Sequence, residues 1–129
     1  MNSYQKQIKK FTDDRNWSQF YNPKDILLGI VEEVGELRNV VKWEQNPEIL
    51  KKVLKANKEE VKDAIGDIYW FLAVLANSCD LDIDKAIEMA IKDNKKRFPV
   101  EKTKGKHTNI YLGGYDSKYR KNNQNLGRR

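Results

Sequence analysis

The stretch VEEVGEL, residues 31–37, places three carboxylates in a segment whose other positions are mostly apolar. Carboxylates are seldom buried without a partner, so acids beside an apolar stripe need an explanation. At roughly 100° per residue of an α-helix, Glu33 and Glu36 fall about 60° and about 120° to the same side of Ile30, the centre of the stripe. They therefore share one flank of the stripe, one turn apart, whereas Glu32 points toward solvent.

A second acidic flank is expected between residues 58 and 78. Asp67 and Glu60 lie within about 20° of each other there, and Asp63 lies about 40° beyond Asp67. Packing the two helices through their apolar stripes would bring the acidic flanks face to face, and a divalent cation would cancel the repulsion between their carboxylates. Oxygen ligands favour Mg²⁺ or Mn²⁺. Because Mg²⁺ usually takes substrate phosphates as further ligands, the pattern indicates phosphate chemistry. The apolar stripe of this second segment is Val61, Ile65, Ile68, Leu72 and Leu75.

The same acids also have a simpler interpretation. Acidic side chains on a helix flank are usually solvated or paired with a lysine three or four residues away, and Lys58 and Lys62 are placed for such pairs. Geometry alone leaves both interpretations open.

The elements that must position these residues are helices. Few Gly or Pro residues and little strand-like alternation occur in residues 1–98, which predicts an all-α fold. We expect about four helices, near residues 4–14, 24–44, 47–78 (with a bend near Asn57) and 84–97. The run IYWFLAVLA, residues 68–76, is apolar nearly all round, and Trp70 points away from the stripe, so we expect a subunit interface there. Residues 1–100 are predicted to form one domain, followed by a basic, partly disordered tail over residues 101–129.

Composition limits the classes of protein that fit. The sequence contains no run of about 18 apolar residues, so no membrane span is predicted. The first residues lack the apolar core of a secretory signal. The single Cys79 suits a reducing cytoplasm. The net charge of +6 resides in residues 101–129, where eight Lys and Arg face two acids. This tail favours anionic partners such as nucleotides or nucleic acid.

A set of ordered motifs covers about residues 8–99. It comprises FTDDRNWSQFYNPKDILLGIVEEVGEL, then Trp43, then GDIYWFLAVLANSCDLDI, and finally DNKKRFP. In these motifs the sequence resembles the MazG-like, all-α nucleotide pyrophosphohydrolases, and among them it is most similar to the dCTP pyrophosphatases. The family motif is ExxE, a spacer, and ExxD. Glu33 and Glu36 fit ExxE, and the apolar run that follows makes Asp67 the matching aspartate.

The resemblance breaks at Ala64, where the family carries the glutamate of ExxD. Asp63 or Glu60 is the candidate replacement, and a site with one ligand fewer is the alternative. The resemblance implies hydrolysis of a nucleoside triphosphate to the monophosphate and pyrophosphate. Mg²⁺ would be held by Glu33, Glu36 and Asp67, and Glu36 is the first candidate to orient the attacking water. It also implies a helical bundle assembled as a homodimer or a dimer-of-dimers homotetramer.

Nucleotide contacts follow from the same resemblance. The tryptophans match positions near the base in the dCTP-specific relatives, although core packing explains them equally well. Tyr21 stands where those relatives carry a histidine. Residues near the terminal motif are candidates for hydrogen bonds to the nucleotide or its phosphates. The full set of candidate substrate-binding residues is Trp17, Tyr21, Trp43, Lys92, Asn94 and Arg97.

Two other classes of function compete with the enzyme. One is a helical module that binds nucleic acid through the basic tail, with binding that weakens steeply as salt rises. The other is a catalytically weak or inactive helical oligomer, which the alanine at position 64 makes plausible. The base, the sugar and the biological pathway do not follow from the sequence.

Overall fold

The computed structural model describes residues 1–119, in which every regular element is a helix. This confirms the predicted all-α class. The chain divides into two compact units, Met1–Ile83 and Asp84–Arg129, and each is described separately. In chain order the elements are α1 (Ser3–Asp14), the 3₁₀ helix η1 (Trp17–Phe20), α2 (Pro23–Asn39), α3 (Pro47–Ala56), α4 (Lys58–Ser78), α5 (Ile83–Arg97), α6 (Val100–Thr103) and the 3₁₀ helix η2 (Ile110–Leu112).

Asparagine side chains start the first three α-helices. Asn2 accepts a hydrogen bond from the Gln5 N–H (2.8 Å), which caps α1. Asn22 and Asn46 cap α2 and α3 in the same way, and each is followed by a proline in the first helical turn. Proline suits this position because its fixed φ is helical and the missing N–H would have no partner there. The Asn-Pro pairs therefore fix where α2 and α3 begin.

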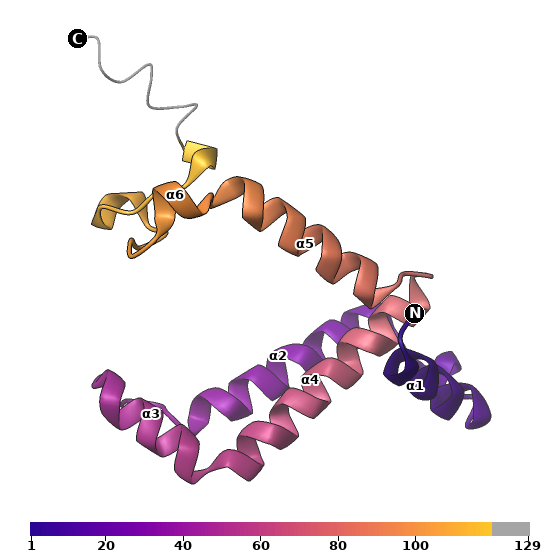
Figure 1. Ribbon diagram of the computed structural model, residues 1–129. Coiled ribbons are helices and arrows are strands. Elements are labelled where there is room, and N and C mark those ends of the chain that lie inside the picture. The colour runs from indigo at the N-terminus through magenta and orange to yellow at the C-terminus, as the bar shows by residue number, and fades with distance from the viewer. Residues whose placement is uncertain (120–129) are drawn as a thin grey trace. The chain divides into compact units, whose positions relative to one another are not determined.

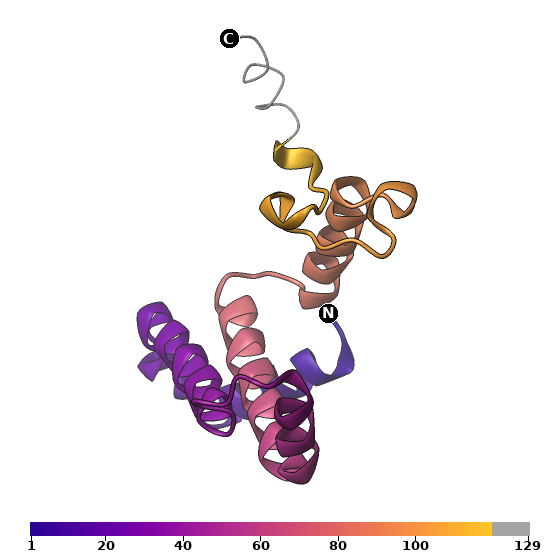
Figure 2. The ribbon, with the colours of Figure 1, turned by 90° about the vertical axis from the view of Figure 1, so that its left-hand side faces the viewer.

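In the first unit, α2 and α4 lie side by side and run in opposite directions, joined through α3 (Figures 1 and 2). Helix α1 packs against α4. Small residues let these helices approach. Ala73 and Ala76 are buried on α4, and Gly29 of α2 lies so close to Phe71 that a Cβ at position 29 would stand 2.7 Å from the phenyl ring. This close packing brings the flanks of α2 and α4 together.

The core of the first unit is small. Ile8, Ile26, Ala73 and Val74 are buried together. Half-buried side chains surround them, namely Tyr21, Tyr69, Trp70, Phe71, Leu75 and Ile83.

A buried glutamine joins the two ends of the first unit. Gln5 is fully buried on α1. Its Nε2 donates to Asn77 Oδ1 (3.0 Å) and to the Leu81 carbonyl (2.8 Å), and its Oε1 accepts from the Ile83 N–H (3.1 Å). The side chain thus satisfies backbone groups that follow α4 and fixes α1 against them.

The second unit contains α5, α6 and η2. Beyond η2 the chain returns to the end of α5, where Arg97 forms an ion pair with the buried Asp116. The segment over residues 101–119, expected as loop, thus contains helical turns, among them α6 and η2, and a charged contact. The part of the predicted tail from residue 120 onward lies outside the described residues. The predicted domain boundary near residue 100 stays a prediction.

Several predicted details differ from the structure. Helix α2 ends at Asn39 instead of near residue 44, and the helix expected over residues 47–78 is two helices, separated at Asn57, where a bend was expected. On α4, Ile65 and Leu72 of the predicted core stripe are exposed, because α4 buries the face that carries its alanines. Trp70 packs edge-on against Phe11 of α1 (5.0 Å between ring centroids), and the subunit interface expected along residues 68–76 stays a prediction. No helix within residues 1–119 has the length and apolar content needed to cross a membrane.

Candidate functional site

The two predicted acidic flanks meet in one pocket between α2 and α4. It has a volume of about 170 Å³, and Glu33 and Glu36 of α2 line it opposite Glu60 and Asp63 of α4. Leu37, Val40 and Ala64 complete its wall. A larger, shallow depression of about 510 Å³ continues along α4 past Asp63 to Asp67. The helical register inferred from the sequence therefore places both groups of acids at one surface.

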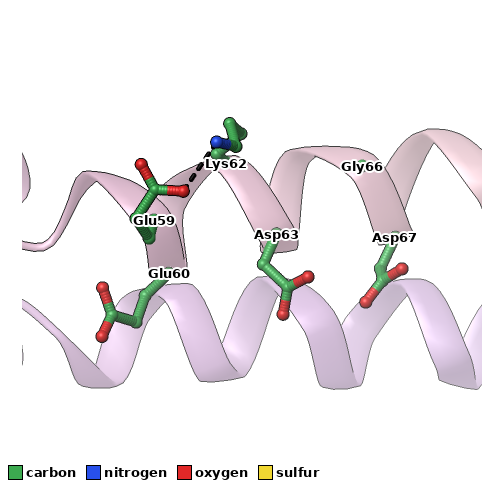
Figure 3. Close-up of a pocket in the computed structure, with 6 residues that line it drawn as sticks. All are labelled: Glu59, Glu60, Lys62, Asp63, Gly66 and Asp67. Carbon is green, nitrogen blue, oxygen red and sulfur yellow. Dashed lines mark hydrogen bonds and ion pairs between the residues drawn. The ribbon is translucent and has the colours of Figure 1, made fainter.

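Within the described residues, 1–119, the lysines do not pair with these acids. In Figure 3, Lys62 pairs with Glu59 (2.6 Å), on the edge of α4 away from Asp63 and Asp67. Within residues 1–119, no basic side chain forms an ion pair with any of the five candidate acids, Glu33, Glu36, Glu60, Asp63 and Asp67. The interpretation that lysine pairs explain the acids is wrong for Lys62.

The pKa of Glu33 reflects both burial in the pocket and the negative charges of the other acids. It is the half-buried member of the acidic set, and its pKa is raised above the usual value, first by burial and then by the negative charges of Asp67, Glu36 and Asp63. Asp67 is the strongest of these charges, although it lies on the other helix. Each of these effects disfavours the charged carboxylate, and a cation in the pocket would favour it.

Ala64 lies in the wall of the same pocket and is 6% exposed. A longer acidic side chain at this position would enter the pocket beside Glu33 and Glu36. The alanine therefore removes a carboxylate from the place where the family motif puts one. Asp63 is the neighbouring acid that both lines the pocket and acts on Glu33, whereas Glu60 lines the pocket only.

The chemistry of the donors suits a hard cation. All candidate ligands are carboxylates, and oxygen ligands are those that Mg²⁺ and Mn²⁺ take. As placed, no group of three or more His, Cys, Asp or Glu side chains in residues 1–119 is drawn together around one metal position. Side-chain rotations would be needed to close a ligand shell, and four of the five acids are exposed and have room to make them.

The candidate base-stacking residues differ in exposure. Trp43 follows α2 and is 80% exposed, with a left-handed backbone (φ 73°) and the Lys42 ammonium 5.1 Å from its ring centroid. Trp17 is less exposed and packs edge-on against Phe11 (5.5 Å between centroids). Core packing therefore does not account for Trp43. Tyr21 is half-buried against the core, and burial raises the pKa of its hydroxyl.

The remaining candidates lie on α5 in the second unit. Lys92 and Asn94 are exposed. The Arg97 guanidinium donates to Asp116 through Nε (2.8 Å to Oδ1) and Nη2. Sequence reasoning missed Asp116. Its one signal was its acidity within a basic segment, and nothing in the spacing linked it to Arg97.

Comparison with known proteins agrees with this arrangement. A model described as the MazG-like family matches residues 30–110, which include all five acids. The chain belongs to the MazG-like family. The dCTP pyrophosphatase 1 of Bos taurus is 30% identical over 108 residues, and that of Rattus norvegicus is 29% identical over 108 residues. Each alignment covers 81% of this chain and 64% of the relative, so this MazG-like chain spans less than two thirds of these relatives' length.

A solved structure extends the comparison to three dimensions. The crystal structure of a pyrophosphatase from Archaeoglobus fulgidus superposes on this MazG-like chain with a TM-score of 0.67 and 26% sequence identity. The match covers 73% of this chain and 87% of that one. The helical arrangement of this chain therefore occurs in a pyrophosphatase.

Proposed function

We propose that this chain is a nucleoside triphosphate pyrophosphohydrolase that depends on Mg²⁺, with Mn²⁺ as a substitute. The observation that carries the proposal is the pocket between α2 and α4, which acids from both helices line, and within residues 1–119 none of these acids forms an ion pair with a basic side chain. The names of the MazG-like relatives support the same reaction class. A deoxynucleotide such as dCTP, or a modified nucleotide, is the candidate substrate. A reducing cytoplasm suits the exposed Cys79.

We assign the metal ligands to Glu33, Glu36 and Asp67, with Asp63 in place of the carboxylate missing at Ala64. Mg²⁺ bound there would offset the charge of the phosphates and acidify a bound water. Glu36 is exposed at the pocket and is our candidate to orient the water and accept its proton. The water oxygen forms a bond to the α phosphorus, and the bond between that phosphorus and the oxygen bridging to the β phosphate breaks. Pyrophosphate then leaves with the displaced electron pair.

The nucleotide contacts are assigned by chemistry and exposure. Trp43 and Trp17 present indole rings on which a base can stack, and Tyr21 is the candidate contact to the sugar or a phosphate. On α5, Lys92 and Arg97 are the candidate phosphate contacts. Asn94 is the candidate to bond the nucleotide or a metal-bound water.

We propose further that the working form is a homodimer or homotetramer. Apolar side chains on α2 and α4 are exposed in the single chain, including Val31 at 68% and Ile65 at 60%. Sedimentation should show a dimer or tetramer, and Val31→Lys should shift it toward monomer. Glu32→Lys, the adjacent charge change, is the control. Equal effects of the two variants, or a monomeric wild type, would refute this assembly.

The enzymatic proposal is tested with purified protein and a panel of canonical and modified NTPs and dNTPs. Reactions contain Mg²⁺, Mn²⁺ or EDTA, and the readout separates pyrophosphate from orthophosphate. We expect metal-dependent pyrophosphate release that falls by at least about 100-fold in Glu36→Gln and Asp67→Asn, because each removes a carboxylate from the charged site. Glu48→Gln is the matched control, since Glu48 pairs with Lys51 on α3 outside the pocket.

Each alternative predicts a different result. A catalytically inactive oligomer would fold and assemble but release no pyrophosphate from any nucleotide with either metal. A nucleic-acid-binding module would bind DNA or RNA with a steep salt dependence and lose that binding when residues 101–129 are deleted. Activity that survives in both acid variants would refute the assigned pocket even if the protein is an enzyme.

A further inference from the structure

The contact between Arg97 and Asp116 lies partly beyond the residues that match the family, 30–110. Asp116 is 4% exposed, and its carboxylate accepts three hydrogen bonds. Two come from Arg97 Nε and Nη2, and the third comes from the Lys118 N–H (3.0 Å to Oδ1). A buried carboxylate held by three donors has one orientation, and so does the guanidinium paired with it.

The loop that carries Asp116 is built to bring it to α5. The Tyr115 N–H donates to the His107 carbonyl (3.1 Å), and the Gly114 N–H donates to the Asn109 carbonyl (2.9 Å). These bonds close a loop between residues 107 and 115. A Cβ at Gly114 would overlap the His107 carbonyl oxygen, so only glycine fits there. The position of Asp116 is thus set by its own backbone and does not depend on Arg97 alone.

The ion pair with Asp116 uses only some of the hydrogen-bond donors of the Arg97 guanidinium. A guanidinium has five N–H groups in a planar fork, and Asp116 takes two of them. No other acceptor in residues 1–119 receives a hydrogen bond from Arg97, and its side chain is 37% exposed. Within residues 1–119, three N–H groups of the fixed guanidinium therefore have no acceptor, and the Phe98 ring lies 5.0 Å from its Cζ atom. Phosphate oxygens are acceptors of matching geometry.

Because Asp116 offsets the charge of Arg97, the pair would contribute to phosphate binding by orienting the guanidinium and not by adding net positive charge. Asp116 lowers the net charge at Arg97 while it holds the guanidinium, and the Arg97 pair keeps the pKa of Asp116 below its usual value. Long-range attraction of a polyphosphate would then come from exposed lysines of α5 such as Lys92. Arg97 would supply directed hydrogen bonds.

We propose that Asp116 is a positioning residue that fixes Arg97 for a phosphate of the bound nucleotide. The proposal rests on the proposed function, in which Arg97 is a phosphate contact. It places a determinant of substrate binding in the loop between residues 107 and 116, near the end of the described chain.

The test compares kcat and KM of wild type, Asp116→Asn, Arg97→Ala and the double variant, with the preferred nucleotide. We expect a rise in KM of about tenfold or more for Arg97→Ala, the range for losing a hydrogen bond to a charged group. Asp116→Asn should raise KM about threefold to tenfold. In the Arg97→Ala background it should add nothing, because it acts through Arg97. Asp116→Glu should recover part of the loss, and Glu101→Gln, an acid removed from α6, should leave KM unchanged.

Two outcomes would overturn the positioning role. Asp116→Asn that leaves KM unchanged would show that Arg97 needs no fixation. An equal loss from Asp116→Asn with and without Arg97 would show a purely structural role for Asp116. If wild type hydrolyses no nucleotide, the proposed function fails, and calorimetric binding of inorganic pyrophosphate decides the positioning role separately. Binding that weakens in both Asp116→Asn and Arg97→Ala supports it, and binding that neither variant changes, or no binding at all, refutes it.

Discussion

Restoring a carboxylate at position 64 is the sharpest test of the pocket between α2 and α4. Ala64 is 6% exposed in the pocket wall, one turn from both Glu60 and Asp67 on the same helix. We compare Ala64→Glu with Ala64→Gln, which has the same size and no charge, so that the difference isolates the carboxylate. The quantity is the free energy of unfolding of each variant in EDTA and in saturating Mg²⁺.

Saturating Mg²⁺ should offset part or all of the stability difference between Ala64→Glu and Ala64→Gln that is expected in EDTA. Neighbours one turn apart lie about 5–6 Å apart, and two like charges at that separation repel by roughly 3 kcal/mol at an effective dielectric of about 20 and by less than about 1 kcal/mol in water. In EDTA, Ala64→Glu should therefore be about 1–3 kcal/mol less stable than Ala64→Gln. If the added carboxylate tightens Mg²⁺ binding about tenfold, saturating Mg²⁺ returns about 1.4 kcal/mol relative to Ala64→Gln, or roughly 4 °C in Tm.

Thermal and urea unfolding with matched EDTA and Mg²⁺ samples measure both numbers. Calorimetric titration with Mg²⁺ gives the affinity independently. If Mg²⁺ stabilises Ala64→Glu no more than Ala64→Gln, the carboxylates around position 64 do not bind the metal. The assignment of the pocket as the metal site would then be wrong, whatever the activity of the wild type.

Three further predictions concern the fold around the site. Glu33→Gln should raise Tm at pH 7 in EDTA, because the raised pKa of Glu33 means that its charged form destabilises the fold. This gain in Tm should disappear as the pH falls through that pKa to below 4.5, where the carboxyl is protonated in the folded and the unfolded chain. A gain that stays constant with pH would contradict the charge explanation. Gln5→Leu should lose about 2–4 kcal/mol in urea unfolding, since three buried hydrogen bonds are lost, and a loss below about 0.5 kcal/mol would refute the proposed role of that side chain. Gly29→Ala should cost about 1–3 kcal/mol through overlap with Phe71, whereas Gly35→Ala, with no atom within 4 Å of its new Cβ, should be neutral or stabilising by up to about 1 kcal/mol.

The helix starts and the acidic surface could be predicted from the sequence because both depend on local rules. In an Asn-Pro pair the asparagine side chain accepts from N–H groups of the first helical turn and the proline fixes a helical φ, which is why α2 and α3 begin where expected. Helical periodicity places the acids of each helix on one flank, and the packing of α2 against α4 brings the two flanks together, although α4 buries its alanine face and leaves Ile65 and Leu72 of the predicted stripe exposed. The pKa shift of Glu33 agrees with the predicted meeting of the two flanks.

The choice of buried face on α4 could not be predicted from the same pattern. Residues 68–76 are apolar on nearly every side, so periodicity does not distinguish the face with Leu72 from the face with Ala73. Close approach of α2 and α1 selects the small side chains, and Leu72 is left exposed. The sequence predicts an apolar helix, and the packing of its neighbours decides which apolar face lies inside.

The contact between Asp116 and Arg97 could not be predicted from the sequence for a different reason. Its partner Arg97 lies 19 residues away, and the loop between them is defined by backbone hydrogen bonds and by glycine at position 114. Such a loop has no periodic signature. Glycine and asparagine indicate turns, but they do not indicate where the chain returns.

The left-handed backbone at Trp43 lowers the stability of the fold, whereas its exposed indole ring would favour binding of a nucleotide base. A left-handed φ of 73° is easy for glycine and costly for a bulky aromatic residue, and the ring gains little burial in return, since it is 80% exposed. A search for heat-resistant variants that ignores nucleotides should therefore favour Gly or Asn at position 43. A search that retains only nucleotide-binding variants should keep the indole if a base stacks on it. The two selections applied to one library would show directly how much stability this chain gives up for its ligand.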